Sequence, residues 1–402
     1  MLKRGMTGWN GCNEMSYFMN KKRLAAVIVI TAMISSVLTM GAWVVLLGLD
    51  QHKVVDLVRF FTTMRLIETR YVDGTDESKL LNGAISGMVQ SLGDPHSIYM
   101  DKDMYTKLMQ HTEGAFGGIG VTMGFKDNKV TIVSVLEGTP GEAAGLLAGD
   151  EIMAVDGTAV AELQPEEVVL HIRGDVGTQV ALTVHREGQE DTDYQLTRAT
   201  IRVPSVKGVP IEGTEMGYIR IASFAENTGK EFREELQKLK DDGAKGIIID
   251  LRQNPGGLIT SCVEVAREIV PKGPIVSVVE KSGHREEYDS ELEKNVLPIV
   301  ALMDGGSASA SEILAGALQD TGAGKVVGVQ SYGKGSVQIV VPLMNDDGLK
   351  LTVAKYYTPS GRSIDGTGIT PDVEAALVPD SGVDSQLEKA KEVLQSALSG
   401  QN

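Results

Sequence analysis

The chain uses the same unit twice: a largely apolar strand, a glycine turn and a helix. Residues 246–251 form the first apolar strand, residues 252–257 the turn, and a helix is expected from about 261 to 269. Residues 299–303 form the second strand, residues 304–306 turn, and Ile313, Leu314, Ala317 and Leu318 give the next helix an apolar face. Glycine turns at the end of a buried strand bring bare backbone N–H groups close to a ligand. The pattern predicts an α/β domain with a reaction site at these turns.

The second turn carries three candidate nucleophiles, Ser307, Ser309 and Ser311. A serine that opens a helix lies at the positive end of the helix dipole, which favours an attacking oxygen and a nearby oxyanion. The same serine also makes a good helix N-cap, which is its ordinary structural role. Spacing alone does not separate the three.

Lys334 lies between two glycines, and Gln338 follows four residues later. A lysine acts as a general base only if burial lowers its pKa from about 10.4. Gln338 can accept a hydrogen bond from the lysine without adding a charge that would raise that pKa. Taken alone, Lys334 would be an ordinary surface lysine between the strands expected at 325–329 and 336–343. Combined with the serine turn, it predicts a serine nucleophile with a lysine base.

The turn Asn254-Pro255-Gly256-Gly257 is suited to an oxyanion hole, whose donors must be fixed before charge develops. The backbone N–H groups of Gly257 and Ala310 are the candidate donors. A phosphate loop is the competing interpretation, and the turn lacks the Gly-Lys-Ser/Thr signature of such loops.

Composition excludes several other classes. The net charge of −16 argues against a nucleic-acid partner. The six histidines show no metal-ligand spacing, and the cysteines, Cys12 and Cys262, have no ligand company, so neither a metal nor a cofactor is expected.

Residues 24–49 contain no charged side chain, whereas residues 21–23 are all basic and Asp50 follows the segment. A run of this length can cross a bilayer, and the charge asymmetry places residues 1–23 in the cytoplasm. We therefore expect a single-pass anchor in the cytoplasmic membrane with an extracytoplasmic catalytic body. It would also put the two cysteines on opposite sides of the membrane. A cleaved signal peptide is the alternative, although its apolar core is usually shorter.

Residues 51–113 are predicted to be a helical arm, with a helix end at Gly93-Asp94-Pro95. The first helix carries more apolar residues than one face needs, which raises dimerisation as an alternative to simple packing. Residues 381–402 add a C-terminal helix from about 384 to 397, whose apolar stripe could pair with a second protomer. A homodimer is expected.

Residues 114–200 change to short strands and turns. The loop Gly118-Ile119-Gly120-Val121 leads into a strand, and the run from Ala144 to Gly157 and a helix at about 166–172 follow. This order resembles a circularly permuted bacterial PDZ domain. The resemblance implies capture of a peptide tail by the glycine loop and edge strand, with Val168, Val169 and Ile172 walling a pocket. Arg173 either contacts the substrate or caps its helix. For the module as a whole, the competing interpretation is a small β-domain that only spaces the other domains.

From about 91 to 373 the chain resembles the carboxyl-terminal processing (tail-specific) serine peptidases. The motifs are Ser91–Pro95, the PDZ pattern, Asp250–Gly257, Gly306–Glu312, Gly333–Gln338 and Tyr357–Arg362. The resemblance implies Ser309 as nucleophile, Lys334 as base and Gln338 as its support. It also implies a ClpP/crotonase-like α/β core over 201–380, with the PDZ domain inserted ahead of it as a gate. Substrates would be proteins bound by free C-terminal tails, including extracytoplasmic regulators processed during sporulation in Gram-positive relatives.

Other functions fit less well. A trypsin-like PDZ protease would need a catalytic histidine and a Gly-x-Ser-Gly-Gly stretch, and a coenzyme-A enzyme on the same core would not explain Lys334 with Gln338. An inactive PDZ scaffold that binds tails without cleavage is the binding-class alternative. For the enzyme we expect a resting state in which the PDZ module misplaces Ser309 and Lys334 until a tail binds.

Overall fold

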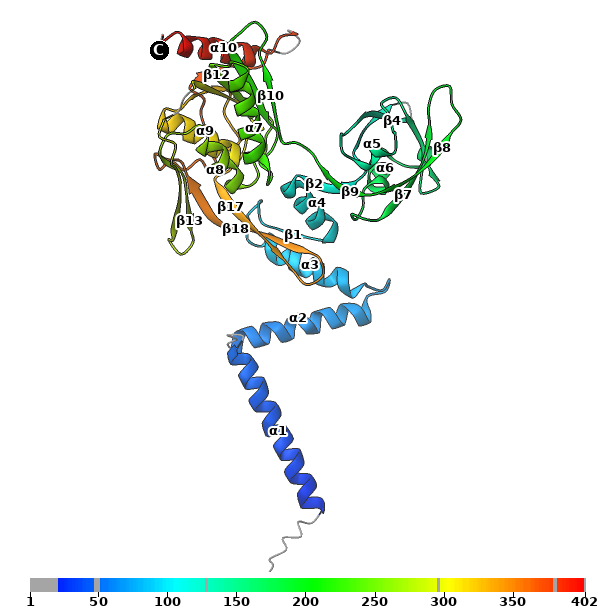
Figure 1. Cartoon of the computed structure of the whole chain (residues 1–402). Coiled ribbons are helices and arrows are strands. Elements are labelled where there is room, and N and C mark those ends of the chain that lie inside the picture. The colour runs from blue at the N-terminus through cyan, green and yellow to red at the C-terminus, as the bar shows by residue number, and fades with distance from the viewer. Residues whose placement is uncertain (1–20, 47–50, 127–128, 295–296, 379–381, 401–402) are drawn as a thin grey trace, which may run out of the picture. The chain divides into compact units, whose positions relative to one another are not determined.

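The computed structural model describes residues 21–46, 51–126, 129–294, 297–378 and 382–400. The chain divides into two compact units, residues 1–85 and residues 86–402. The first unit holds helices α1 (Lys21–Leu46) and α2 (Gln51–Arg70), drawn in blue in Figure 1. Helix α3 (Glu77–Gln90) runs across the boundary between the units.

The predicted membrane anchor spans residues 24–49, and residues 47–49 lie outside the described part of the chain. In the part that is described, no helix combines the length and the apolar character needed to cross a membrane.

The second unit is built on a six-stranded sheet in the order β10-β11-β12-β15-β16-β19. Its strands are β10 (Val206–Pro210), β11 (Met216–Ile221), β12 (Gly246–Asp250), β15 (Ile299–Met303), β16 (Lys325–Gly328) and β19 (Val373–Glu374). Strands β11 to β19 are parallel, and β10 runs antiparallel to β11. Strands β12 and β15 are buried along their whole length, which is why their sequences are apolar except for Asp250 at the end of β12.

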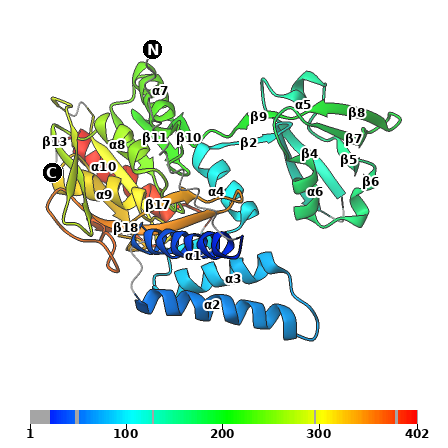
Figure 2. The ribbon, with the colours of Figure 1, turned by 90° about the horizontal axis from the view of Figure 1, so that it is seen from below.

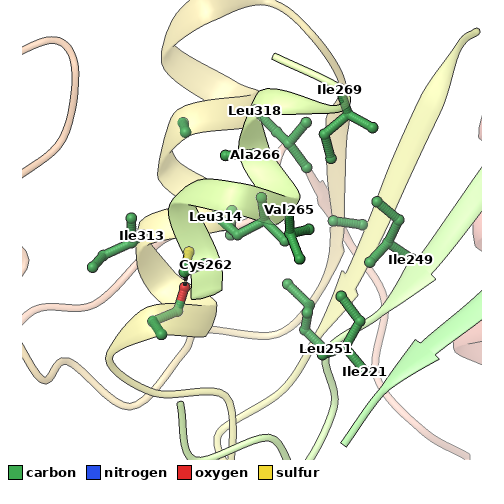
Figure 3. Packing of buried hydrophobic residues seen from close by; sticks show 14 of the residues in the cluster. Ile221, Ile249, Leu251, Cys262, Val265, Ala266, Ile269, Ile313, Leu314 and Leu318 are labelled. Atoms are coloured by element: carbon green, nitrogen blue, oxygen red, sulfur yellow. Dashed lines mark hydrogen bonds between the residues drawn. The ribbon is translucent and has the colours of Figure 1, made fainter. Parts of the chain in front are cut away.

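Three helices cover one face of this sheet: α7 (Thr228–Asp241), α8 (Ile259–Arg267) and α9 (Ala310–Thr321). Figure 3 shows part of the shared core, with Ile249 and Leu251 on the sheet side and Val265, Leu314 and Leu318 on the helices. The expected helices and strands of both repeated units are present within a few residues of their predicted bounds.

Helix α10 (Ser385–Leu398), drawn red in Figures 1 and 2, packs on the opposite face. Ala390 and Leu394 are fully buried against Ile248 of β12 and Val300 of β15. The expectation that this apolar stripe pairs with a second protomer therefore needs correction, because the chain's own sheet already covers it.

A second, antiparallel sheet has the order β1-β18-β13-β14, with β17 on the other side of β18. Its strands are β1 (Ile98–Met100), β13 (Gly273–Glu280), β14 (Arg285–Ser290), β17 (Ser336–Pro342) and β18 (Gly348–Tyr357). Strand β1 interrupts the helical arm predicted for residues 51–113, before α4 (Lys102–Glu113). Local pattern could not predict β1, because the partner it pairs with, β18, lies about 250 residues away.

The PDZ-like module forms its own sheet in the order β3-β4-β5-β7-β8, with β6 beside β5. Its strands are β3 (Val121–Lys126), β4 (Lys129–Val135), β5 (Glu151–Val155), β6 (Thr158–Ala159), β7 (Gln179–His185) and β8 (Thr192–Thr197). The short helices α5 (Pro140–Ala143), η1 (Val160–Glu162) and α6 (Pro165–Ile172) complete it. Strand β2 (Ala115–Gly118) precedes the module in the sequence and β9 (Ala199–Arg202) follows it, and the two strands pair with each other.

Candidate active site

The three catalytic-looking motifs meet because they follow three adjacent parallel strands. Asn254 to Gly257 follow β12, Ser309 follows β15, and Lys334 follows β16. The carboxyl ends of parallel strands lie at one edge of the sheet, which is the usual position of a site in an open α/β sheet. The topology thus gathers residues that are up to 80 positions apart in the sequence.

Hydrogen bonding separates the three candidate serines. The Ser307 hydroxyl is buried, donates to the Leu251 carbonyl at 2.8 Å and accepts from the Asp304 N–H. The Ser311 hydroxyl is also buried and donates to the Asn254 carbonyl at 3.0 Å. Ser309 is partly exposed, and within the described chain its hydroxyl makes no such bond to the turn after β12. Of the three, Ser309 is thus the serine whose hydroxyl proton is not donated to a buried carbonyl in the described chain.

The backbone of Ser309 is strained. Its φ of 54° and ψ of −115° lie outside the regions that L-residues ordinarily occupy. Gly256 packs directly against it, since a Cβ at position 256 would lie 2.8 Å from the Ser309 Cβ and 2.7 Å from the Ala308 carbonyl oxygen. Only glycine lets the oxyanion-hole turn approach the nucleophile turn this closely.

The buried Glu312 carboxylate holds the serine and lysine segments together. It accepts hydrogen bonds from the N–H groups of Ser309 (2.8 Å), Gly333 (2.7 Å) and Lys334 (2.9 Å) and from the Ser331 hydroxyl (2.5 Å). The Tyr356 hydroxyl makes a second link, because it contacts the carbonyl oxygens of both Ser309 and Lys334. Sequence reasoning missed both residues, although Glu312 stands three positions after Ser309, at the spacing of a capping box.

Lys334 is half-buried, and its pKa is lowered from the usual 10.5. Desolvation is the largest cause, and the positive charge of Lys350 on β18 acts in the same direction. The negative charges of Glu312 and Asp94 oppose both effects. The net lowering is what a lysine base requires.

Gln338 lies on β17, four residues after Lys334 in the sequence. Its amide nitrogen donates to the hydroxyls of Ser336 (2.9 Å) and Thr352 (3.0 Å). Among the described residues, no hydrogen bond joins Ser309 to Lys334 or Lys334 to Gln338 through their side chains. Hydrogen bonds of a catalytic group often form only in the complex with substrate, so this geometry does not rule out the predicted pairing.

The two predicted oxyanion donors belong to different segments: Gly257 to the turn after β12, and Ala310 to the start of α9. Phe224 pairs with the residues on both sides of Gly257: its N–H donates to the Gly256 carbonyl, and its carbonyl accepts from the Leu258 N–H. This pairing does not use the Gly257 N–H. Ala310 begins α9, where the first N–H groups have no partner inside the helix. A Cβ on Gly256 would lie 2.9 Å from the Ala310 nitrogen, which shows how near the two turns are.

The PDZ-like module contains a cavity of about 280 Å³. Its lining includes Gly118, Ile119, Gly120, Val121, Val169, Ile172 and Arg173. The prediction for Val168 was wrong: its side chain is fully buried in the module's core, and Val169, one position further round the helix, faces the cavity.

Arg173 stacks on the Phe116 ring, with its guanidinium carbon 3.9 Å from the ring centroid. Burial lowers the pKa of its guanidinium. Arg173 and Phe116 also line a second cavity of about 430 Å³, together with His111 and Ser223 among others. Arg173 therefore belongs to the wall between two cavities and does not only cap its helix.

Comparison with known proteins identifies the class. The model of peptidase family S41 matches residues 215–375, a PDZ domain model matches 117–193, and a model described as the activating protease CtpB N-terminal domain matches 49–104. These three matches confirm the expected combination of an S41 protease fold with a PDZ domain.

Individual relatives agree over most of the chain. A carboxy-terminal-processing protease of Bartonella bacilliformis is 41% identical over 332 residues, which cover 81% of this chain and 76% of that protein. The carboxy-terminal processing protease CtpB of Bacillus subtilis is 39% identical over 81% of this chain and 68% of its own. The solved photosystem II D1 C-terminal processing protease is 30% identical, covers 84% of this chain and 96% of its own, and has a TM-score of 0.48. The protein belongs to the carboxy-terminal processing proteases of peptidase family S41, which are serine peptidases.

Proposed function

We propose that the protein is an endopeptidase with a Ser309/Lys334 dyad, which cleaves protein substrates captured by their C-terminal tails. The observation that carries this proposal is the separation of the serines. Ser307 and Ser311 donate their hydroxyl protons to buried backbone carbonyls, whereas the Ser309 side chain is an acceptor in the capping box of α9 and donates to no carbonyl in the described chain. The base is supported by the lowered pKa of Lys334.

The reaction follows from these groups. Neutral Lys334 removes the proton from the Ser309 hydroxyl as its oxygen attacks the scissile carbonyl. The N–H groups of Gly257 and Ala310 stabilise the resulting oxyanion. Lys334 then gives the proton to the leaving amine as the peptide C–N bond breaks. In the second half of the reaction Lys334 takes a proton from a water molecule, whose oxygen attacks the acyl carbonyl, and returns it to the Ser309 oxygen as the ester bond breaks. Gln338 aims the lysine throughout.

The test compares cleavage of an unstructured protein such as casein by the full chain and by three alanine variants. Ser309→Ala should abolish cleavage, whereas Ser307→Ala and Ser311→Ala should retain it in proportion to how much enzyme stays folded, as measured by circular dichroism. Retained cleavage by a folded Ser309→Ala variant would assign the nucleophile to another residue. Tail binding without cleavage by the wild-type protein would favour the inactive scaffold.

We also propose that the PDZ module gates the site. The support is that the Ser309 and Lys334 side chains share no hydrogen bond in the described chain, and that most of the predicted tail-binding residues line a cavity. A tail peptide with a free carboxylate should raise the rate of casein cleavage, and the same peptide with an amidated end should not.

The anchor over residues 24–49 and the extracytoplasmic location remain proposals that rest on the uncharged run and its basic flank. Membrane fractionation and protease accessibility of intact cells test both. A homodimer and a role in processing sporulation regulators are proposed from the family resemblance alone.

A further inference from the structure

The Gln338 amide nitrogen lies against two hydroxyls. The Thr352 hydroxyl also bonds the Asp94 carboxylate, so its proton is used there and it serves the amide as an acceptor. Both of its N–H groups are directed to hydroxyls, of Ser336 at 2.9 Å and of Thr352 at 3.0 Å. A primary amide has two N–H donors and one carbonyl oxygen, so this arrangement leaves the oxygen as the end available to Lys334.

We infer that Thr352, supported by Ser97, is a positioning residue that makes the Gln338 carbonyl oxygen, and not its NH₂ group, face Lys334. The inference rests on the proposed Ser309/Lys334 mechanism and adds to it residues from two further segments of the chain.

A β-bulge brings Thr352 and Gln338 opposite each other. Along the β17–β18 pair, Val337 faces Ala354, but Gln338 faces Thr352. The pairing skips Val353, and without this extra residue Gln338 would lie opposite Val353, whose side chain has no acceptor. Bulges beside active sites commonly re-aim a side chain in this way.

Ser97 completes the support from the other side of β18. Strand β1 pairs with residues 348–350 of β18 and β13 with residues 354–357, so Thr352 lies between the two partners. Its N–H instead donates to the buried Ser97 hydroxyl at 3.0 Å, and that hydroxyl donates to Asp94 at 2.6 Å. Because Ser97 gives its only proton to Asp94, it is available as an acceptor for the Thr352 N–H.

The chemistry explains why the orientation matters. A carbonyl oxygen accepts an N–H of Lys334 and leaves the amine lone pair for the Ser309 proton. A reversed amide would donate to that lone pair and block it. Its N–H dipole would also disfavour the ammonium form of Lys334, which lowers the pKa of the lysine further.

The test uses the full chain and a fluorogenic peptide with a free C-terminus. Thr352→Val keeps the side-chain shape and removes the hydroxyl that accepts from Gln338, whereas Thr352→Ser keeps that hydroxyl. Ser97→Ala removes the hydroxyl that accepts from the Thr352 N–H. Thr214→Val is the matched control, since Thr214 makes two hydrogen bonds in the turn before β11, outside the candidate site.

We expect Thr352→Val to lower kcat about tenfold or more with KM unchanged, and to move the rising limb of the pH profile to lower pH. Thr352→Ser should stay within about twofold of wild type in kcat and keep its pH profile. Thr214→Val should match wild type, and Ser97→Ala should show a smaller loss of kcat than Thr352→Val.

A folded Thr352→Val variant with wild-type kcat and pH profile would overturn the inference, as would a Thr352→Ser variant as impaired as Thr352→Val. If Thr352→Val does not fold, Ser97→Ala decides, and wild-type kinetics there would overturn the inference. The Lys334→Ala variant separates a failure of the proposed dyad from a failure of the role of Thr352. If Lys334→Ala is inactive and Thr352→Val is unaffected, only the role of Thr352 is refuted. If Lys334→Ala is fully active, the dyad is refuted and this inference with it.

Discussion

The backbone N–H of Lys334 donates to the Glu312 carboxylate at 2.9 Å, so the candidate base is held by the first turn of the helix that carries the candidate nucleophile. The same carboxylate accepts from the Ser309 N–H at 2.8 Å. One buried side chain therefore sets the distance between two catalytic segments that follow different strands.

Replacement of Glu312 tests this link. Glu312→Gln keeps one acceptor oxygen but presents an NH₂ group to donors that face it, which leaves buried groups unpaired at a cost of about 1–3 kcal/mol each. We expect a lower free energy of unfolding in urea and a loss of kcat larger than the fraction of unfolded enzyme explains. Glu234→Gln on the exposed face of α7 is the control and should change neither quantity. Full activity and stability of Glu312→Gln would contradict the linking role.

The pH dependence of the wild-type enzyme reports the pKa of Lys334. Lysine is a base only when unprotonated, and burial lowers the pKa of Lys334 from its usual 10.5. Peptidase activity should therefore rise with pH and reach its plateau below the pH at which an ordinary lysine loses its proton. The measurement is kcat/KM of a peptide substrate from pH 6 to 10, over which a flat profile would argue against Lys334 as base.

Lys350 should tune that profile. Its positive charge lowers the pKa of Lys334, while Glu312 and Asp94 raise it. Lys350→Met removes the like charge, so the pKa of Lys334 rises and the rising limb moves to higher pH, with activity at neutral pH reduced. Lys272→Met, at an exposed position, serves as the control and should leave the profile in place. A shift of the Lys350→Met profile to lower pH would contradict the assignment.

Arg252 should be a stability residue. Its guanidinium contacts the fully buried Asp250 at 2.7 Å and Asp384, the N-cap of α10, at 2.8 Å. Arg252→Met leaves the Asp250 charge without its main partner, and breaking a buried pair in this way costs roughly 3–5 kcal/mol. Urea denaturation should show a loss of this size. Arg285→Met, which breaks an exposed pair with Glu287, should cost at most about 1 kcal/mol. Equal stabilities of the two variants would refute the prediction.

Much of this protein was determined by local sequence. Buried apolar runs such as residues 299–303 predicted strands, and glycine turns predicted where the chain would leave the sheet. The order of the motifs also carried the family resemblance, which predicted Ser309, Lys334 and Gln338 as a set. Local periodicity likewise located the helices of the protease core and of the PDZ module.

Only the tertiary structure decided the rest, because it depends on partners that are distant in the sequence. The structural roles of Ser307 and Ser311 follow from the carbonyls of Leu251 and Asn254, more than 50 residues earlier. The strand at Ile98–Met100 exists because β18 offers it an edge, and α10 is covered because the sheet has a second apolar face. Val168 and Val169 are both apolar, and only the packing of their helix shows which one enters the core. Local pattern reports what a residue can do, whereas burial and hydrogen-bond partners across the fold determine which of those roles it takes.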